Sequence, residues 1–202
     1  VSVKGLLGST TSSQDTVETD RIDVTSQSGA VTVSGIIQAQ NRIEAQGRSI
    51  NILAGGRVEA TATGSEVYLR AGQELWVSGI VDTTEAGRIQ ADGLLHLYAD
   101  ELLMQGKLEQ TDASGRTLLN AASDMTITGQ VETAGALEVN AGVDAGWNKD
   151  RLQGVIEESE LSGGTLLIQG AGKLDADAAV TLQAGQDVTV QARAVNDGNT
   201  RT

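Results

Sequence analysis

The stretch VYLRAGQELWV, residues 67–77, contains two short runs in which apolar residues alternate with other residues. Alternation with a period of two is typical of a β-strand that buries one face and exposes the other. Gly72 and Gln73 separate the two runs, as expected of a turn. The stretch therefore predicts two short strands joined by a tight corner, with alternate aliphatic side chains directed into a shared interior.

The same runs return along the chain. The first is repeated at residues 95–100, 137–142 and 180–185, and the second at residues 188–190. A third and shorter run follows a glycine, as at residues 56–60. Three short strands separated by glycines and small polar residues close one coil of roughly triangular section, so the repeat predicts a β-solenoid.

Seven glycines mark the repeat, at intervals that average about 23 residues, the length of one solenoid coil. They are Gly35, Gly56, Gly79, Gly106, Gly129, Gly154 and Gly172. Two positions after each marker comes a branched aliphatic residue, and we expect these to stack as one inward ladder: Ile37, Val58, Val81, Leu108, Val131, Ile156 and Leu174. The predicted fold class is all-β, a parallel β-solenoid with three short strands per coil and about 20–25 residues per coil.

The array is predicted to span residues 29–202, with an inserted loop near residues 143–150 that breaks the alternation. Residues 1–28 are expected to form an irregular N-terminal coil or the frayed end of the array, because residues 9–20 are rich in Ser and Thr. The chain begins Val-Ser-Val without a Met or a signal-peptide pattern, which predicts that it is a piece of a larger protein.

The composition excludes several classes of function. With no Cys, the chain has no disulfide, zinc–thiolate site or iron–sulfur cluster. A formal net charge of −13 argues against sequence-independent nucleic-acid binding, which needs clustered Lys and Arg. No apolar run approaches the roughly 20 residues of a membrane-spanning helix, so no membrane insertion is expected. Two Trp, two Tyr and no Phe indicate a core of many small aliphatic contacts.

The phrase AGQDVTVQA, residues 184–192, resembles the haemagglutinin repeats of filamentous-haemagglutinin-like exoproteins, and variants of it occur at residues 71–75, 123–127 and 141–142. The resemblance covers roughly residues 29–202. It implies a right-handed parallel β-helix from the shaft of a very long bacterial protein that is secreted or displayed at the cell surface. It also implies two-partner secretion, in which an outer-membrane partner exports the full-length chain.

From the repeat and this resemblance we predict a structural shaft segment of a large bacterial adhesin, which acts as a rigid spacer and a contact surface. The expected partners are a protein or glycan on a host or neighbouring cell, and adjacent solenoid segments that meet end to end. No cofactor is expected. Three alternatives stay open: a polysaccharide-active β-helix enzyme, a self-assembling extracellular fibre or matrix subunit, and the stalk of a contact-dependent toxin carrier.

No catalytic residue is predicted. The single histidine, His96, lies between Leu95 and Leu97, so alternation directs it outward, and a lone exposed His is a surface residue far more often than a general base. Paired carboxylates can hydrolyse a glycosidic bond, and the chain holds many carboxylates but no pair that the pattern distinguishes. The enzyme alternative therefore requires two or three acidic side chains that converge in a groove.

An acidic column is predicted on an outward face. Three positions after the marker glycines come Gln38, Glu59, Asp82, Glu109, Glu132, Glu157 and Asp175. Stacked carboxylates repel one another, and the repulsion is relieved by solvent, by bound Ca²⁺ or by the cations one strand position away, which are Arg57, Lys107 and Lys173. We expect a solvated face that keeps the rod soluble. In the less favoured calcium hypothesis, the ligands are Asp82, Glu109 and Glu132.

A contact patch is predicted at outward positions that adjacent coils bring together. It consists of Leu53, Trp76 and Leu103 in one strand, and in another of Tyr68 stacked over His96 and Arg70 stacked over Tyr98. Exposed Trp, Tyr and Arg are enriched at protein interfaces, and an aromatic surface can also stack on sugar rings. The alternative is that another segment of protein covers these residues.

Overall fold

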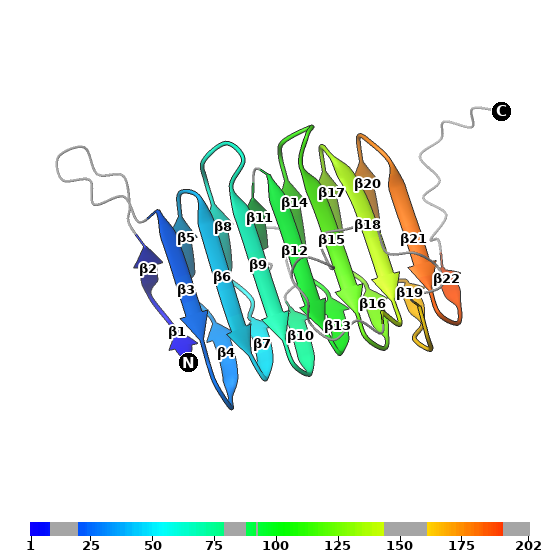
Figure 1. The fold of residues 1–202 in the computed structure, drawn as a ribbon, viewed down its shortest axis with the longest axis horizontal. Helices are drawn as coiled ribbons and strands as arrows, with labels where there is room; N and C mark the ends of the chain where they lie inside the picture. Colours follow the sequence, from blue (N-terminus) through cyan, green and yellow to red (C-terminus); the bar gives the residue numbers. More distant parts are fainter. Residues whose placement is uncertain (9–19, 79–87, 92, 144–160, 192–202) are drawn as a thin grey trace.

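The computed structural model of the chain describes residues 1–8, 20–78, 88–91, 93–143 and 161–191. These residues form strands, bends and turns, and none of them lies in a helix. The strands lie side by side along a rod, which Figure 1 shows from blue at the N-terminus to red near the C-terminus. The predicted class is confirmed: the fold is all-β, with parallel strands stacked as a β-solenoid.

Each coil contributes one strand to each of three parallel sheets, which we name A, B and C. Sheet A consists of β1 (Ser2–Val3), β4 (Ala30–Val33), β7 (Ser49–Ile52), β10 (Glu74–Val77), β13 (Glu101–Met104), β16 (Met125–Ile127), β19 (Leu166–Ile168) and β22 (Val188–Val190). Sheet B consists of β2 (Leu6–Gly8), β5 (Ile36–Ala39), β8 (Arg57–Ala60), β11 (Arg88–Ala91), β14 (Lys107–Gln110), β17 (Gln130–Thr133) and β20 (Lys173–Ala176). Sheet C consists of β3 (Arg21–Thr25), β6 (Arg42–Gly47), β9 (Glu66–Ala71), β12 (Leu94–Ala99), β15 (Arg116–Ala121), β18 (Ala136–Ala141) and β21 (Val180–Ala184).

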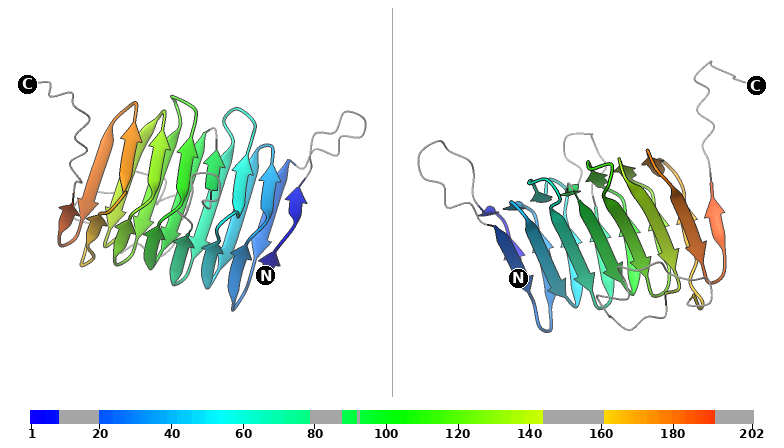
Figure 2. Two further views of the ribbon diagram at one scale, coloured as in Figure 1. Left: turned by 180° about the vertical axis from the view of Figure 1, so that it is seen from behind. Right: turned by 45° about the horizontal axis from the view of Figure 1, so that its top comes forward.

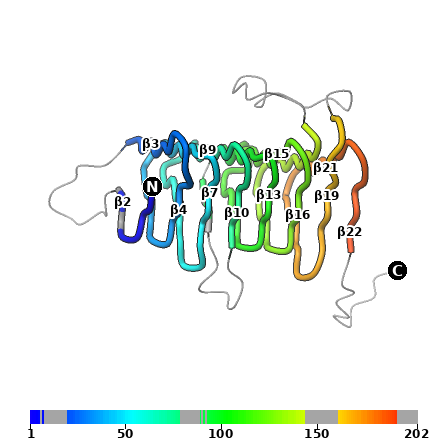
Figure 3. Tube along the Cα trace, turned by 90° about the horizontal axis from the view of Figure 1, so that it is seen from below, coloured from blue at the N-terminus to red at the C-terminus, as the bar shows by residue number. Residues whose placement is uncertain are grey.

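Successive coils stack in register. Along the chain, a strand of sheet A is followed by one of sheet B and one of sheet C before the next coil begins. The left view of Figure 2 shows the stacked strands from behind, and in Figure 3 the coils follow one another as loops of the tube. Because paired strands lie about 4.8 Å apart, the eight strands of sheet A give a rod of about 34 Å.

The predicted aliphatic ladder is confirmed at five of its seven positions. Ile37 is the Cα partner of Val58, Leu108 is the partner of Val131, and Val131 is the partner of Leu174. The first four of these side chains are fully buried, and Leu174 packs against the same core. Each such burial contributes about 1.5–3 kcal/mol, so repeated aliphatic contacts stabilise the rod without aromatic rings.

The ladder prediction is wrong at Val81. That residue lies outside the described part of the chain, and its predicted place belongs to Ile89, which is fully buried and is the Cα partner of both Val58 and Leu108. Counting from Gly79 misses this position because the connection from β10 to β11 is longer than the other connections between sheets A and B.

The ladder prediction is also wrong at Ile156, which lies outside the described residues. Val131 on β17 pairs directly with Leu174 on β20, so no rung of the ladder lies between them. The long connection from β18 to β19 contains Gly154. This glycine therefore belongs to an insertion and does not mark a coil.

The N-terminal segment contributes strands to all three sheets, whereas only the start of the predicted insertion is described. Of the two alternatives for residues 1–28, an irregular coil or the end of the array, strands β1, β2 and β3 agree with the second, because they pair in parallel with β4, β5 and β6. Residues 144–150 of the predicted insertion lie outside the described residues. At its start, Val143 is fully buried and forms an antiparallel bridge with Leu161.

Besides the connection from β10 to β11, the corners after β7 and after β19 are two residues longer than those after β4, β13 and β16. In the corner after β7, the Gly56 N–H donates to the Leu53 carbonyl at 2.8 Å and closes a four-residue turn. The third residue of the turn, Gly55, has a φ of 77°, in the left-handed region that a type II turn requires and glycine adopts without strain. A second four-residue turn closes at residues 169–172, where the Gly172 N–H donates to the Gln169 carbonyl at 2.9 Å; here the left-handed residue is the second of the turn, Gly170, with a φ of 67°.

The inward columns lose their cover toward the last described coil. Val188 and Val190 of β22 continue the columns of Leu166 and Ile168, yet they are 44 % and 57 % exposed, whereas Leu166 is fully buried. A solenoid coil covers its apolar edges only with a neighbour on each side. The middle coils have two neighbours and the last described coil has one, which accounts for the difference.

Candidate contact surfaces

Trp76 projects from β10 on the outer face of sheet A, with 41 % of its surface exposed. Its Cα partner on β13 is Leu103, as predicted, and Thr126 on β16 continues the row. The indole Nε1 donates a hydrogen bond to Gln105 Oε1 at 3.0 Å. Because Gln105 follows β13, this bond ties the ring to the neighbouring coil and fixes its direction.

Leu53 does not lie in this row, contrary to the prediction. The Cα partner of Trp76 on β7 is Asn51, and Leu53 lies two residues further along, in the corner that follows β7. The cause is the long turn at residues 53–56, which moves the marker glycine two positions away from the strand. Alignment on glycines therefore assigns to Leu53 the place that Asn51 occupies.

A hollow of about 370 Å³ lies beside Trp76 on the outer face of sheet A. It is lined by Glu74, Leu75, Trp76, Glu101, Leu102, Leu103, Asp124 and Thr126. Its three acidic residues each stand two positions before an outward residue of the row, and Glu74 and Glu101 are Cα partners. This acid-x-outward spacing is visible in the sequence, but the contact-patch prediction missed it because it considered only apolar and aromatic residues.

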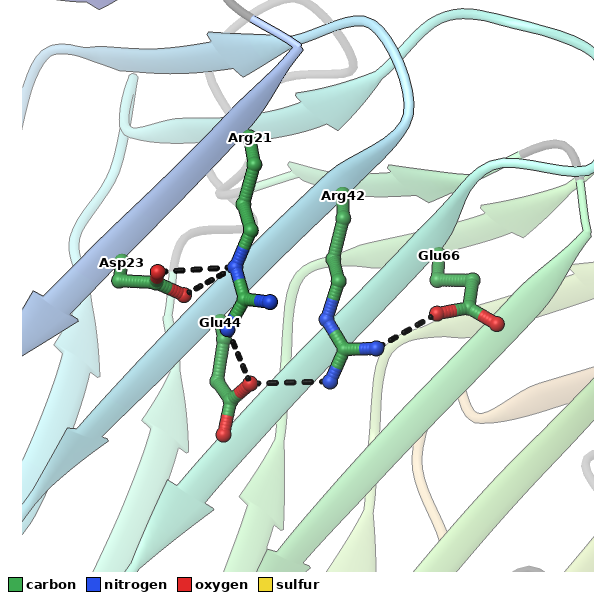
Figure 4. Close-up of polar contacts among 5 residues, drawn as sticks. All are labelled: Arg21, Asp23, Arg42, Glu44 and Glu66. Carbon is green, nitrogen blue, oxygen red and sulfur yellow. Dashed lines mark hydrogen bonds and ion pairs between the residues drawn. The ribbon is translucent and has the colours of Figure 1, made fainter.

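A chain of ion pairs crosses β3, β6 and β9 on the outer face of sheet C (Figure 4). Arg21 Nε donates to both carboxylate oxygens of Asp23, at 2.9 and 2.8 Å, and its Nη2 reaches Glu44 Oε2 at 3.3 Å. The same Glu44 oxygen accepts from Arg42 Nη2 at 2.9 Å, and Arg42 Nη1 donates to Glu66 Oε2 at 3.0 Å. Arginine and acid alternate, so no carboxylate in this group faces another without a cation between them.

The polar chain continues into an aromatic group. The Arg42 guanidinium lies 4.4 Å from the centroid of the Tyr68 ring, and the Tyr68 and His96 rings meet edge to face at 6.0 Å. His96 Nε2 is 3.3 Å from Asn120 Nδ2, and Asn140 Nδ2 donates to Asn120 Oδ1 at 2.9 Å. The predicted stacking of Tyr68 over His96 is therefore confirmed.

The expectation that His96 is exposed is wrong. Leu95 and Leu97 on either side belong to the core, so His96 does point outward, but only 1 % of its surface is exposed. The outward residues Tyr68 and Leu118 on the adjacent strands are buried as well, at 3 % and 1 %, and are not members of the core cluster. Alternation therefore identifies the side of the sheet correctly, while the surface on that side is covered.

Burial changes the proton affinity of both rings. Desolvation, with a smaller contribution from the nearby Arg116 charge, lowers the pKa of His96 to about 4, so the imidazole is neutral at physiological pH. Desolvation and the Glu66 carboxylate raise the pKa of Tyr68 to about 12, so the phenol keeps its proton. The group is therefore a neutral aromatic pair beside a charged chain of arginines and acids.

Arg70 and Tyr98 are Cα partners on β9 and β12, which confirms the second predicted stack. Both side chains are only partly buried, in contrast to Tyr68 and His96 one row away. Burial lowers the pKa of Arg70, although the nearby Tyr98 opposes this shift. The predicted contact patch thus divides into a covered half and a half that solvent reaches.

The acidic column of sheet B is confirmed in part. The register aligns Gln38, Glu59, Gln90, Glu109, Glu132 and Asp175. Asp82 and Glu157 lie outside the described residues, and Gln90 occupies the place predicted for Asp82. The reason is the same long connection between β10 and β11 that misplaced the ladder.

The predicted cations neutralise this column. Lys107 Nζ lies 2.9 Å from Glu132 Oε2 and 3.5 Å from Glu109 Oε2. Lys173 Nζ lies 2.7 Å from Asp175 Oδ2 and 3.7 Å from Glu132 Oε1. The bond to Asp175 and the charges of both acids raise the pKa of Lys173. Each lysine therefore bridges acids of two adjacent coils.

The described residues of the acidic column are not arranged as a calcium site. Within the described ranges, no group of three or more His, Asp or Glu side chains is placed to hold a metal ion. Arg57 Nη1 also approaches Glu59 Oε1, at 3.9 Å. Relief of the repulsion by cationic side chains is thus the arrangement that the structure has.

The sequence analysis missed a buried polar corner between sheets B and C. The side-chain oxygen Oε1 of Gln110 accepts from Thr133 Oγ1 at 2.7 Å and from the Gly135 N–H at 3.0 Å, while Nε2 donates to the Asp112 carbonyl at 2.6 Å. Any side chain at Gly115 would overlap the Gln110 amide. Gln110 lies on the inward side of its strand, two positions after Leu108, and a single Gln at a strand end carries no sequence signal for this role.

Comparisons with protein-family models, with curated proteins and with solved structures found no match to this chain. In the parts of the chain that the structure describes, no helix is long and apolar enough to cross a membrane. The functional argument therefore depends on the rod, its faces and their charges.

Proposed function

We propose that the chain is a shaft segment of a large secreted or cell-surface bacterial adhesin, where it serves as a rigid spacer and a contact surface. The observation that carries this proposal is the unbroken parallel pairing of all three sheets from β4 to β19. Such pairing makes length additive, since each further coil extends the rod by about 4.8 Å.

The division between interior and exterior supports the same role. Inward positions repeat one chemistry, as in the fully buried Ile37, Val58 and Leu108. Outward positions differ from sheet to sheet, with ion pairs on sheet B, a covered aromatic group on sheet C and Trp76 on sheet A. A uniform interior keeps the rod stiff while the exterior is free to vary and to make contacts.

Surface location is tested with antibodies raised against the folded chain. Intact cells of the organism that produces the protein are labelled with gold-conjugated antibody and viewed by electron microscopy. We expect gold on or beyond the outer surface of intact cells. Label that appears only after the cells are permeabilised contradicts the proposal.

The spacer role is tested by removing one coil. Deletion of residues 106–128 removes β14, β15 and β16 and joins Gln105 to Gly129, the equivalent corner of the next coil. We expect a folded rod that is shorter by about 4.8 Å in solution scattering. The control deletes residues 106–117, which leaves an incomplete coil and is expected to lose cooperative unfolding. Equal loss of structure in both deletions contradicts the additive rod.

A further inference from the structure

The hollow on sheet A differs from the other charged surfaces because no cation among the described residues pairs with its acids. On sheet B the acids contact Lys107 and Lys173, and on sheet C they contact Arg21 and Arg42. The Glu74 and Glu101 carboxylates make no ion pair or hydrogen bond with any described residue, although the two residues are exposed Cα partners on adjacent strands. Like charges directly opposite each other destabilise a sheet, so a cation supplied from outside is favoured here.

An apolar strip runs beside these acids. Trp76 and Leu103 are Cα partners on the same two strands as Glu74 and Glu101, and both pairs line the hollow. The hydrogen bond from Trp76 to Gln105 fixes the indole ring beside this strip. The hollow is thus a shallow groove with an acidic edge and an aromatic and aliphatic floor.

The acidic edge consists of three carboxylates at regular spacing along the rod. Glu74 and Glu101 begin β10 and β13, and Asp124 directly precedes β16, so the three acids follow one another at about 4.8 Å along the axis. Asp124 accepts two hydrogen bonds from Thr165, both through Oδ1 at 2.8 Å. This arrangement gives a line of about 10 Å with negative charge at its two ends and its middle.

We propose that this groove binds a linear polyamine, a ligand whose ammonium groups are separated by short methylene chains. The ammonium groups pair with Glu74, Glu101 and Asp124, and the methylenes lie on Trp76 and Leu103. Tryptophan also attracts a cation over its ring face. At about 370 Å³ the hollow lies at the small end of ligand pockets, which suits a slender chain better than a fused ring system.

A metal ion is not the cation that this groove selects. The described His, Asp and Glu side chains form no group of three that is placed to hold one, and the line of acids is too extended for a single coordination sphere. The polyamine proposal goes beyond the spacer role and does not depend on it.

Fluorescence of Trp76 provides the test. The chain contains two tryptophans, so every variant carries Trp147→Phe and emission reports Trp76 alone. Spermidine is titrated at low ionic strength, where charge interactions are least screened. We expect a saturable change in emission, and about 3- to 10-fold weaker binding when Glu74→Gln and Glu101→Gln are combined.

The matched control changes the net charge by the same amount on another face. It combines Glu109→Gln with Glu132→Gln on sheet B and is expected to bind spermidine within about twofold of the parent. Equal weakening by both pairs shows attraction to the net charge of −13 alone and overturns the site. An emission change that does not saturate overturns it as well.

Two further probes decide the ligand class. Butylamine, which has one ammonium group, is expected to bind at least about tenfold more weakly than spermidine, and equal binding overturns the requirement for a linear polycation. The capped peptide Gly-Lys-Gly-Lys-Gly tests lysine side chains of a protein partner. Saturable binding of this peptide without binding of spermidine overturns the polyamine and identifies a basic peptide as the occupant.

Discussion

Sheets B and C present similar alternating patterns to the outside, yet their outer faces differ in kind. On sheet B the outward side chains are charged and reached by solvent, and Lys107 and Lys173 bridge acids of adjacent coils. On sheet C the outward His96 and Leu118 are each 1 % exposed. The difference teaches that outward and exposed are separate properties of a strand position.

The physical consequence is a difference in dielectric environment. A charge on sheet B is solvated and screened, so its pairing contributes little to stability. A charge placed on the covered part of sheet C loses its hydration. The same kind of substitution should therefore change the free energy of unfolding by different amounts on the two faces. The largest loss is expected for a charge placed in the core between the sheets.

The largest effect is expected for Leu108→Asp, at a fully buried inward position of sheet B. An unpaired carboxylate in the aliphatic ladder should lower the free energy of unfolding by more than about 4 kcal/mol. Urea unfolding followed by circular dichroism measures the loss. Its control is Thr126→Asp, at a partly buried outward position of sheet A, where a loss as large as that of Leu108→Asp would contradict the assigned faces.

The next effect separates the two outward faces. Leu118→Asp on sheet C should cost about 3 kcal/mol, because the carboxylate becomes buried directly opposite its acidic Cα partner Glu138. Gln130→Asp on sheet B should change stability by less than about 0.5 kcal/mol, since it lies between Lys107 and Lys173 in the register. Equal melting temperatures for the two variants would remove the distinction between the faces.

The third test is the pH dependence of stability, to which His96, the only histidine of the chain, should contribute. Folding lowers the pKa of His96 to about 4, whereas an unfolded His titrates near about 6.5. Between these values the unfolded chain binds a proton that the folded chain does not, so stability falls as pH decreases from about 6.5 to about 4. The contribution reaches up to about 3 kcal/mol and is constant below the lower value.

The control for the acid test is His96→Gln, which removes this titration and leaves all carboxylates in place. Unfolding is measured across the same pH range for both proteins. The parent should lose more stability than the variant on acidification. Parallel pH profiles would show that His96 titrates as an exposed residue, in conflict with its burial.

The smallest effect is expected for Glu109→Gln on sheet B. The variant loses a 3.5 Å contact with Lys107 but also loses repulsion from its Cα partner Glu132. The two changes oppose each other, so stability should change by less than about 0.5 kcal/mol. Differential scanning calorimetry in low and high salt measures it, and a loss above about 1 kcal/mol would show that sheet B is less solvated than its exposure indicates.

Much of the fold could be predicted from particular residues. The alternation at 67–77 identifies β9 and β10, and the columns through Ile37 and Leu108 identify the inward face of sheet B. The pairs Tyr68 with His96 and Arg70 with Tyr98 follow from the same register. These predictions succeed because they depend on strand geometry, which alternation within a few residues reveals.

The failures have one physical cause in common. Val81 and Leu53 were misplaced because connections between sheets A and B differ in length, and a count from a glycine cannot detect an insertion. The sequence predicted the apolar side of the groove beside Trp76 but not its acidic edge, because Glu74 and Glu101 form that edge only when their strands lie side by side. Each failure concerns which residues of distant sequence meet.

The amino-acid sequence by itself determined the period of the repeat, the three strands of each coil and the side of the strand on which each residue lies. These properties are local, since they follow from backbone geometry over a few residues. Only the tertiary structure decided that Ile89 continues the ladder, that His96 is covered and that the acids beside Trp76 pair with no cation among the described residues. Stacking, cover and charge balance depend on residues that are far apart in the chain, and folding alone brings these together.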